Sequence, residues 1–269
     1  MFRRSGYRFA DKNMRNAKNL AVTEDAVLGG RLVLRQPRRG HRFGHDAILL
    51  AASTPAKAGE HVVEFGAGVG AAGLALASRV PGLALTLVEI DRELATLAGE
   101  NISRNGLADG VRAVTLDVTA GARAFAAEAL PPGSAARVLM NPPFNDPAVS
   151  RASPDAGRRC AHVSAGIAPW LNSAQRLLGA GGTVTLIWRA DGLGDVLSAL
   201  APGFGAITAQ PVHPRADAPA VRVLVRAVKG SGAPLVLLPP LVLAGTDGRP
   251  SAEAEAVLRH GGALPLADV

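Results

Sequence analysis

The segment that points most directly to chemistry is Asn141-Pro142-Pro143-Phe144, which follows a short run predicted to be a strand. Two consecutive prolines restrict φ and remove two backbone donors, so the carbonyl groups of Pro142 and Pro143 are held rigidly. A side-chain amide beside such a carbonyl can accept both protons of a planar amino group, and Phe144 offers a flat face on which a base turned out of its strand can stack. The segment therefore predicts catalysis at an exocyclic NH2 group, and a proline-rich turn with a packed phenylalanine is the structural alternative.

A glycine-rich turn follows a buried strand predicted at 61–65. Gly66, Gly68 and Gly70 stand at every second position, whereas a turn that binds a pyrophosphate has the spacing G-x-G-x-x-G. Because glycine has no Cβ, the chain can turn sharply here and a ligand can approach the backbone closely. The spacing favours a ligand without a pyrophosphate, and a tight strand-to-helix connection in a chain with 31 glycines is the alternative.

Acidic residues end the next two predicted strands. Glu89 stands 23 positions after Gly66, where a carboxylate can accept hydrogen bonds from the two hydroxyl groups of a ribose. Asp117 follows the strand predicted at 111–116 and is placed to accept a hydrogen bond from an adenine amino group. Each acid could instead cap the helix that follows it. Together with the glycine turn, they predict a nucleoside site in one crevice at the carboxyl ends of adjacent strands.

Short β-rich runs alternate with helical patterns between residues 61 and 200, which predicts parallel strands joined by right-handed crossovers. The strands at 205–212 and 221–228 have no helix between them and should pair as an antiparallel hairpin at the sheet edge. We therefore expect an α/β fold with a seven-stranded, mostly parallel sheet that ends in this C-terminal hairpin. The expected parts of the chain are a basic N-terminal arm (1–42), a catalytic domain (43–229) and a C-terminal extension packed on the body (230–269).

The basic residues are concentrated in the N-terminal segment. Residues 1–42 contain eleven Lys or Arg and three acids, a net charge of +8, whereas the other 227 residues sum to −1. A neutral body with a cationic segment is typical of a polyanion binder, which makes a nucleic acid the expected partner, and a solvated arm is the alternative. Met14 is a second candidate for the first residue. The candidate RNA-binding residues are Arg35, Arg38, Arg39 and Arg42, with Arg151, Arg158 and Arg159 in a loop that is otherwise an ordinary surface loop.

Other features of the composition exclude several classes of protein. No apolar stretch reaches the roughly 18 residues that a bilayer crossing needs. Cys160 is the only cysteine and cannot form an internal disulfide, and no secretory leader opens the sequence. We therefore expect a soluble cytoplasmic protein. The histidines and Cys160 lack the spacing of metal ligands, so no metal is expected. The oligomeric state is not predicted.

Taken together, these segments resemble a class I S-adenosylmethionine-dependent methyltransferase of the N-P-P-[FY] group, with its Rossmann-like fold. Residues 28–53, the glycine turn, the Asn141 motif and the segment His213-Pro214-Arg215 are similar to the bacterial tRNA(Val) adenine-N6 methyltransferase family, which modifies the adenosine beside the anticodon. The resemblance covers most of residues 20–260. It implies S-adenosylmethionine as cofactor, S-adenosylhomocysteine as product and tRNA as the acceptor.

The resemblance also implies a role for individual residues. The cofactor-binding residues would be Gly44, Asp46, Glu64, Gly66, Gly68, Gly70, Glu89, Asp117 and Asn141. Within that set, Glu64 and the glycine turn would hold the methionine part, Glu89 the ribose and Asp117 the adenine. His45 departs from the family, which more usually has threonine at that position.

The catalytic residues would be Asn141, Pro142, Pro143 and Phe144. Hydrogen bonds from the acceptor amino group to Asn141 and to the Pro142 carbonyl would favour a tetrahedral nitrogen whose lone pair faces the sulfonium methyl, without a general base of strongly shifted pKa. The expected function is methyl transfer to adenine N6 in tRNA. The enzymatic alternatives are guanine N2 in ribosomal RNA and a glutamine side chain of a release factor. The alternative of another class is an RNA-binding module with a decayed cofactor fold.

Overall fold

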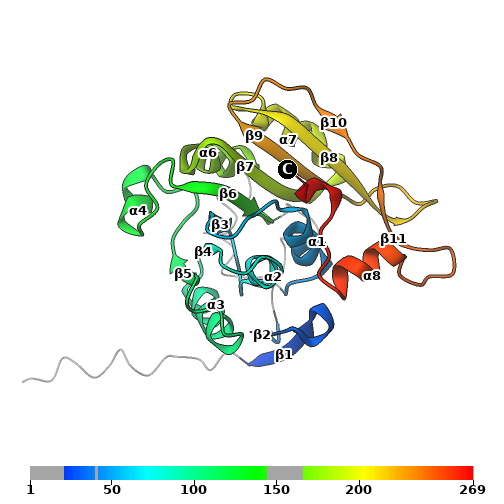
Figure 1. Ribbon diagram of the computed structural model, residues 1–269, viewed down its shortest axis with the longest axis horizontal. Helices are drawn as coiled ribbons and strands as arrows, with labels where there is room; N and C mark the ends of the chain where they lie inside the picture. Colours follow the sequence, from blue (N-terminus) through cyan, green and yellow to red (C-terminus); the bar gives the residue numbers. More distant parts are fainter. Residues whose placement is uncertain (1–20, 40–41, 144–165, 269) are drawn as a thin grey trace, which may run out of the picture.

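The computed structural model describes residues 21–39, 42–143 and 166–268, and it consists of a large sheet with helices on both faces and a separate hairpin (Figure 1). The hairpin contains β1 (Val22–Val27) and β2 (Leu32–Pro37). The strands of the large sheet are β3 (His61–Phe65), β4 (Ala84–Glu89), β5 (Val111–Thr115), β6 (Ala135–Met140), β7 (Leu178–Arg189), β8 (Phe204–Arg215), β9 (Arg222–Lys229), β10 (Val236–Leu237) and β11 (Leu241–Ala244). The helices are α1 (His45–Ser53), α2 (Ala71–Arg79), α3 (Arg92–Arg104), α4 (Ala122–Ala127), α6 (Ala168–Leu177), α7 (Leu193–Leu200) and α8 (Ala252–Leu258), with short 3-10 turns at Leu28–Gly30, Ala190–Gly192 and Pro265–Ala267.

The order of the strands confirms the predicted α/β fold. The sheet runs β5-β4-β3-β6-β7-β9-β8; the first five strands are parallel, and β9 is antiparallel to both of its neighbours. The expectation of seven strands with the C-terminal hairpin at the edge was wrong. β10 and β11 both pair with β8 and cover its outer side, so the described sheet has nine strands. Pro239 and Pro240 separate these two short strands, since proline cannot donate a hydrogen bond to a sheet.

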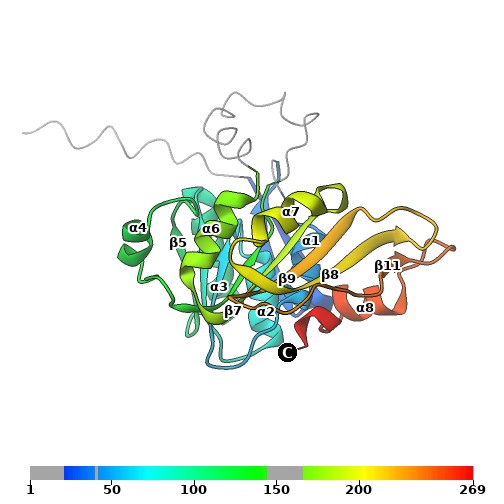
Figure 2. The ribbon, with the colours of Figure 1, turned by 90° about the horizontal axis from the view of Figure 1, so that it is seen from above.

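The two faces of the sheet carry different helices. Helices α1, α2, α3 and α8 pack on one face, and α4, α6 and α7 pack on the other (Figures 1 and 2). Because side chains alternate along a strand, Val62 belongs to the first cluster and Val63 and Phe65 to the second. The Phe65 ring meets the ring of Phe125 edge-on, with 5.9 Å between the centroids. β3 therefore has a buried side chain on each face and runs through the centre of the core.

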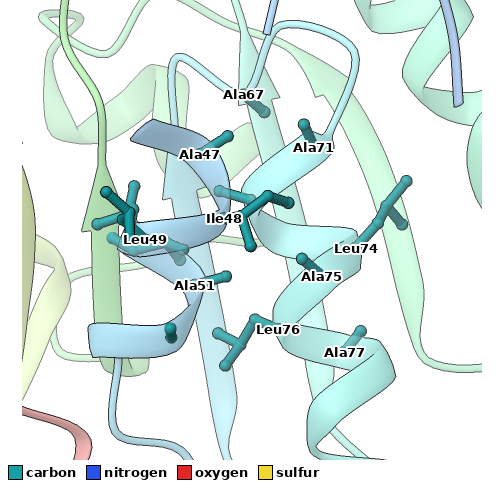
Figure 3. Packing of buried hydrophobic residues seen from close by; sticks show 14 of the residues in the cluster. Ala47, Ile48, Leu49, Ala51, Ala67, Ala71, Leu74, Ala75, Leu76 and Ala77 are labelled. Atoms are coloured by element: carbon teal, nitrogen blue, oxygen red, sulfur yellow. The ribbon is translucent and has the colours of Figure 1, made fainter. Parts of the chain in front are cut away.

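Small side chains allow α1 and α2 to pack closely beside each other (Figure 3). Ala47 and Ala51 of α1 face Ala71 and Ala75 of α2 (Figure 3). Both helices begin near Ala67, which belongs to the turn before α2. Alanine has no side-chain entropy to lose in a helix and leaves room for a neighbouring backbone. The beginning of α1 and the turn before α2 are thereby placed at the same edge of the sheet.

The chain ends are attached to this core at two places. The β1–β2 hairpin lies against α3, so residues 22–37 of the expected arm are folded onto the body, while residues 1–20 lie outside the described residues. In the extension, the amide of Leu264 donates to the Ala52 carbonyl at 2.8 Å, and the Arg226 guanidinium donates to the carbonyls of Leu266 and Asp268. Among the described residues, no helix is both long and apolar enough to cross a bilayer.

Candidate active site

The three glycines of the turn after β3 share a backbone conformation but differ in their surroundings. All three have positive φ angles, +65° at Gly66, +57° at Gly68 and +87° at Gly70, where a residue with a Cβ is strained. A Cβ on Gly66 would lie 2.7 Å from Cη2 of Trp170, and one on Gly70 would lie 2.8 Å from Cδ1 of Leu87. A Cβ on Gly68 would meet no described atom within 4 Å. Gly68 is thus the glycine beside which a ligand has room.

Glu89 is directed back toward this turn. Its Oε2 accepts a hydrogen bond from the Gly68 amide at 2.8 Å, its Oε1 accepts one from the Asp91 amide at 2.9 Å, and the residue is 7% exposed. The alternative that Glu89 caps α3 was wrong, because Asp91 is the N-cap and accepts from the amides of Glu93 and Leu94. Each carboxylate oxygen of Glu89 retains a second lone pair, with which it could accept a hydrogen bond from a hydroxyl group.

Asp117 closes the turn after β5. Its Oδ1 accepts hydrogen bonds from the Thr119 amide at 2.8 Å and from the Thr119 hydroxyl at 2.7 Å. The N-cap of α4 is Gly121, so Asp117 is not the cap of that helix. The amide of Leu116 donates to the Glu89 carbonyl at 2.9 Å, which brings the ends of β4 and β5 together. The two acids that were predicted to bind a nucleoside therefore follow adjacent strands at one edge.

Glu64 lies deep beneath the glycine turn. It is 3% exposed, and its Oε2 accepts a hydrogen bond from the Gly73 amide of α2 at 2.8 Å. Burial raises the pKa of Glu64 to about 8; the Gly73 hydrogen bond opposes this shift, and the negative charge of Glu89 adds to it. The side chain is therefore mostly protonated at neutral pH. A Cβ on Gly73 would lie 2.5 Å from Oε2, so the glycine in α2 makes room for this carboxyl group.

The Asn141 segment emerges next to the glycine turn. Met140 pairs with Phe65 across β6 and β3, so Asn141 and Gly66 both directly follow paired residues of adjacent strands. Asn141 is partly exposed, Pro142 is buried and Pro143 is exposed. The Asn141 amide makes no hydrogen bond to another described residue. Phe144, Arg151, Arg158 and Arg159 lie outside the described residues.

The start of α1 is fixed at the same edge by an ion pair. Gly44 is the N-cap of α1, and Oδ2 of Asp46 accepts a hydrogen bond from Nε of Arg222 at 2.8 Å. Arg222 pairs with Arg189 where β9 and β7 run antiparallel, so it stands at the carboxyl end of β7. Asp46 was predicted from the sequence, whereas Arg222, which lies 176 residues away, was not.

A second residue that the sequence analysis missed is Asn101 of α3. It is fully buried, and its amide hydrogen-bonds to the backbone of Arg35 and to the carbonyl of Val69 in the glycine turn. The sequence could have indicated Asn101 by its position, because it follows Ala98 by three residues. This spacing places a polar side chain on the apolar face of the helix.

The basic residues of the hairpin region fall into two groups. Arg35 forms an ion pair with Glu100 at 2.5 Å, and Arg42 forms one with Asp25 at 3.0 Å, so acids offset both charges. Arg38 and Arg39 follow β2, are exposed, and form no ion pair with another described residue. No acid among the described residues therefore offsets the charges of Arg38 and Arg39. Arg31 has no ion pair with a described residue either, and it donates to the carbonyls of Leu28 and His260.

Comparison with known proteins identifies the family. Residues 42–192 match the family model of the methyltransferase small domain. The chain belongs to this family. This methyltransferase is similar to the crystal structure of a predicted O-methyltransferase from Agrobacterium tumefaciens, with 28% identity and a TM-score of 0.69 over 81% of this chain and 98% of that chain. It shares its fold with a SAM-dependent O-methyltransferase from Thermotoga maritima, with 18% identity and a TM-score of 0.51 over 73% of this chain and 69% of that chain. No curated protein sequence matches it significantly.

These findings confirm the predicted class I methyltransferase with S-adenosylmethionine as its cofactor. The residues fit this cofactor, since the turn leaves space at Gly68 and a buried carboxylate with unused lone pairs stands directly beside it. The chemistry available at the site is thus methyl transfer from this cofactor.

Proposed function

We propose that this methyltransferase modifies an exocyclic amino group of an RNA base, namely adenine N6 in tRNA at the adenosine beside the anticodon of tRNA(Val). The observation that carries the proposal is the place of Asn141. The side-chain amide of Asn141 has no hydrogen bond to a described residue. Asn141 directly follows Met140, which pairs with Phe65, the residue before the glycine turn. A side-chain amide at this position that the described residues do not engage is suited to hold an acceptor close to the cofactor.

The cofactor would be held by the residues that surround the open space at Gly68. Glu89 would accept hydrogen bonds from the ribose hydroxyl groups through its remaining lone pairs, and Asp117 would accept one from the adenine amino group. Glu64 and the backbone of Gly66, Gly68 and Gly70 would surround the methionine part. Gly44 and Asp46 would border the same site at the start of α1, and Asn141 would border it at the end of β6.

The bound cofactor supplies an electrophilic methyl group on its sulfonium. The chain's own residues would position the acceptor: the Asn141 amide oxygen and the Pro142 carbonyl accept the two amino protons, and Phe144 stacks on the base. An adenine N6 lone pair is delocalised into the ring, so these two acceptors favour the pyramidal nitrogen and stabilise its developing positive charge. By holding the acceptor nitrogen in a fixed orientation toward that methyl group, the same residues would supply the remaining acceleration.

RNA is favoured over a protein acceptor because of charge. Arg38 and Arg39 are exposed without an ion pair to another described residue, and they precede α1, which begins at the same edge as the glycine turn. Arginines without a partner can bind backbone phosphates, which hold an RNA in register. A single glutamine side chain of a release factor needs no such contacts.

The acceptor can be tested by incubating the protein with labelled S-adenosylmethionine and separate pools of tRNA, ribosomal subunits and release factor. Digestion of the labelled product should yield N6-methyladenosine from tRNA. N2-methylguanosine, methylglutamine or a 2′-O-methylated nucleoside would each refute the proposed acceptor. A 2′-O-methylated nucleoside would instead indicate an O-methyltransferase, as the name of the Agrobacterium protein says of that protein. Failure to bind S-adenosylhomocysteine would indicate the decayed, non-catalytic alternative.

The role of Asn141 can be tested with two substitutions. Asn141→Ala removes the acceptor oxygen and should lower transfer by about 100-fold or more, by analogy with the loss of one transition-state hydrogen bond. Affinity for S-adenosylhomocysteine should persist. Asn141→Asp keeps an acceptor oxygen at this position and should retain more transfer than the alanine variant. Unchanged turnover in Asn141→Ala would count decisively against the mechanism.

A further inference from the structure

Asn101 of α3 and Asn105, the C-cap of that helix, hold the outer edge of β2. Asn105 accepts a hydrogen bond from the Val33 amide and donates one to the Val33 carbonyl, both at 3.0 Å. Asn101 accepts from the Arg35 amide at 2.7 Å and donates to the Arg35 carbonyl at 3.0 Å. The spacing matches because four residues of a helix rise about 6 Å and two residues of a strand rise about 6.7 Å. The two amides thus pair with β2 as a neighbouring strand would.

Asn101 makes one contact that Asn105 lacks. Its amide nitrogen also donates to the Val69 carbonyl, at 3.0 Å, and the residue is fully buried. Both protons of the amide are therefore used, one on the hairpin and one on the glycine turn. Asn105 is only partly buried and donates its other hydrogen bond to the Asn101 carbonyl within α3.

Val69, which Asn101 contacts, is the central residue between two glycines of the turn. It lies between Gly68 and Gly70, whose positive φ angles are +57° and +87°, so glycine's wide conformational freedom surrounds it on both sides. The Gly68 amide donates to Glu89, and the Val69 carbonyl accepts from Asn101. Two side chains from different elements therefore hold consecutive residues of the turn in the conformation that leaves space at Gly68.

We propose that Asn101 is a positioning residue for the cofactor site, which couples the β1–β2 hairpin to the glycine turn. This inference rests on the placement of S-adenosylmethionine at that turn. Cofactor binding stabilises the turn, the turn fixes the Asn101 amide, and that amide fixes Arg35 in β2. Because coupling between two sites is reciprocal, the docked hairpin strengthens cofactor binding by the same factor.

Ion pairs between the hairpin and α3 do not replace this coupling. Arg35 pairs with Glu100, and Arg104 pairs with Glu24, both at 2.5 Å. The four side chains are between 31% and 50% exposed, so solvent screens them, and neither pair contacts the glycine turn. They hold the hairpin on α3 whether or not the turn is occupied.

Asn101→Ala and Asn105→Ala form a matched pair of variants, since each removes one amide from β2 but only the first removes a contact with the turn. The measurement is the dissociation constant of S-adenosylhomocysteine by isothermal titration, at a temperature where circular dichroism shows each variant to be folded. Asn101→Ala should raise the constant about 5- to 10-fold, the effect of one buried hydrogen bond, and Asn105→Ala less than about 2-fold. Equal effects of the two variants would overturn the proposal, because they would reflect a general loss of structure.

A second measurement uses the unaltered protein and decides the question even if Asn101→Ala does not fold. Saturation with S-adenosylhomocysteine should slow hydrogen exchange of the Arg35 amide, which donates to Asn101, by several-fold. The Val33 amide, which donates to Asn105, should change less. Equal responses of the two amides, or none, with the ligand bound would refute the coupling. If the unaltered protein did not bind the ligand, the cofactor placement itself would be refuted.

Discussion

Replacing Glu64 with glutamine should make the stability of the protein less dependent on pH. Glu64 is buried beneath the glycine turn, and burial raises its pKa to about 8, with a further contribution from the charge of Glu89. Glutamine has nearly the same shape, and its amide oxygen can accept the hydrogen bond from the Gly73 amide. The substitution therefore removes the titration while keeping the contact with α2.

The sign and size of the effect follow from proton linkage. The pKa of Glu64 is about 8 in the folded chain and near its ordinary value of 4.5 in the unfolded chain, so between these values the folded state retains a proton that the unfolded state has released. The stabilisation is fully present below pH 4.5 and is lost as the pH rises toward 8, at about 1.4 kcal/mol per pH unit. Between pH 5 and pH 7.5 the wild type should thus lose about 3 kcal/mol from this group.

Urea unfolding at several pH values, followed by circular dichroism, measures this difference. The free energy of unfolding of Glu64→Gln minus that of the wild type should rise by about 3 kcal/mol from pH 5 to pH 7.5. Any constant cost of burying the amide group shifts this difference at all pH values alike and leaves its slope unchanged. The prediction therefore concerns the slope alone.

Glu60 provides a control with the opposite shift. Burial alone would raise its pKa, but hydrogen bonds and the positive charge of Arg137 outweigh burial and hold the pKa of Glu60 below its usual value. Its contribution to stability is present above pH 4.5 and is lost only at lower pH, so Glu60→Gln should differ from the wild type by a constant amount between pH 5 and 7.5. If the curves for Glu64→Gln and the wild type were also parallel over this range, Glu64 would be ionised in the folded protein and the reasoning from burial would be wrong.

The glycine turn and the basic residues give two further predictions. Gly66→Ala should lower the free energy of unfolding by more than about 2 kcal/mol, because its Cβ would overlap the ring of Trp170, whereas Gly68→Ala should cost about 1 kcal/mol and mainly weaken binding of S-adenosylhomocysteine. Thermal melts and titrations of both variants measure this contrast, and a larger loss of stability in Gly68→Ala would contradict it. The double substitution of Arg38 and Arg39 by glutamine should reduce the slope of log affinity for tRNA against log salt by about 1.5. An unchanged slope would remove these arginines from the RNA-binding surface.

The sequence predicted the parts of the site that depend on local order along the chain. Glycines directly after a buried strand and an acid at the end of the next strand must lie at one edge when the strands are parallel, and the structure places Gly68 and Glu89 in contact. The same reasoning placed Asn141 beside the turn. The α/β alternation similarly predicted that the central strands are parallel, although it did not give their order in the sheet.

The features that the sequence did not predict depend on contacts between distant segments. β10 and β11 are too short and too interrupted by proline to show a strand period. The polar run Val22–Val27 did not read as a strand, and it becomes one because it pairs with β2. The partner of Asn101 in that hairpin, Arg35, lies 66 residues away, and a buried amide in a helix does not indicate which backbone it will satisfy.

The glycine turn is where separate parts of the fold converge. The Gly68 amide is held by Glu89 from β4, the Val69 carbonyl by Asn101 from α3, and Gly66 lies against Trp170 from α6. A turn rich in positive φ angles has little conformational preference of its own, so its shape depends on these three contacts and on the backbone hydrogen bonds that Ala67 makes with Val88 and Gly70. The helix that carries Trp170 packs on one face of the sheet and the helix that carries Asn101 on the other. A displacement of either helix would therefore reach the glycine turn through a single contact.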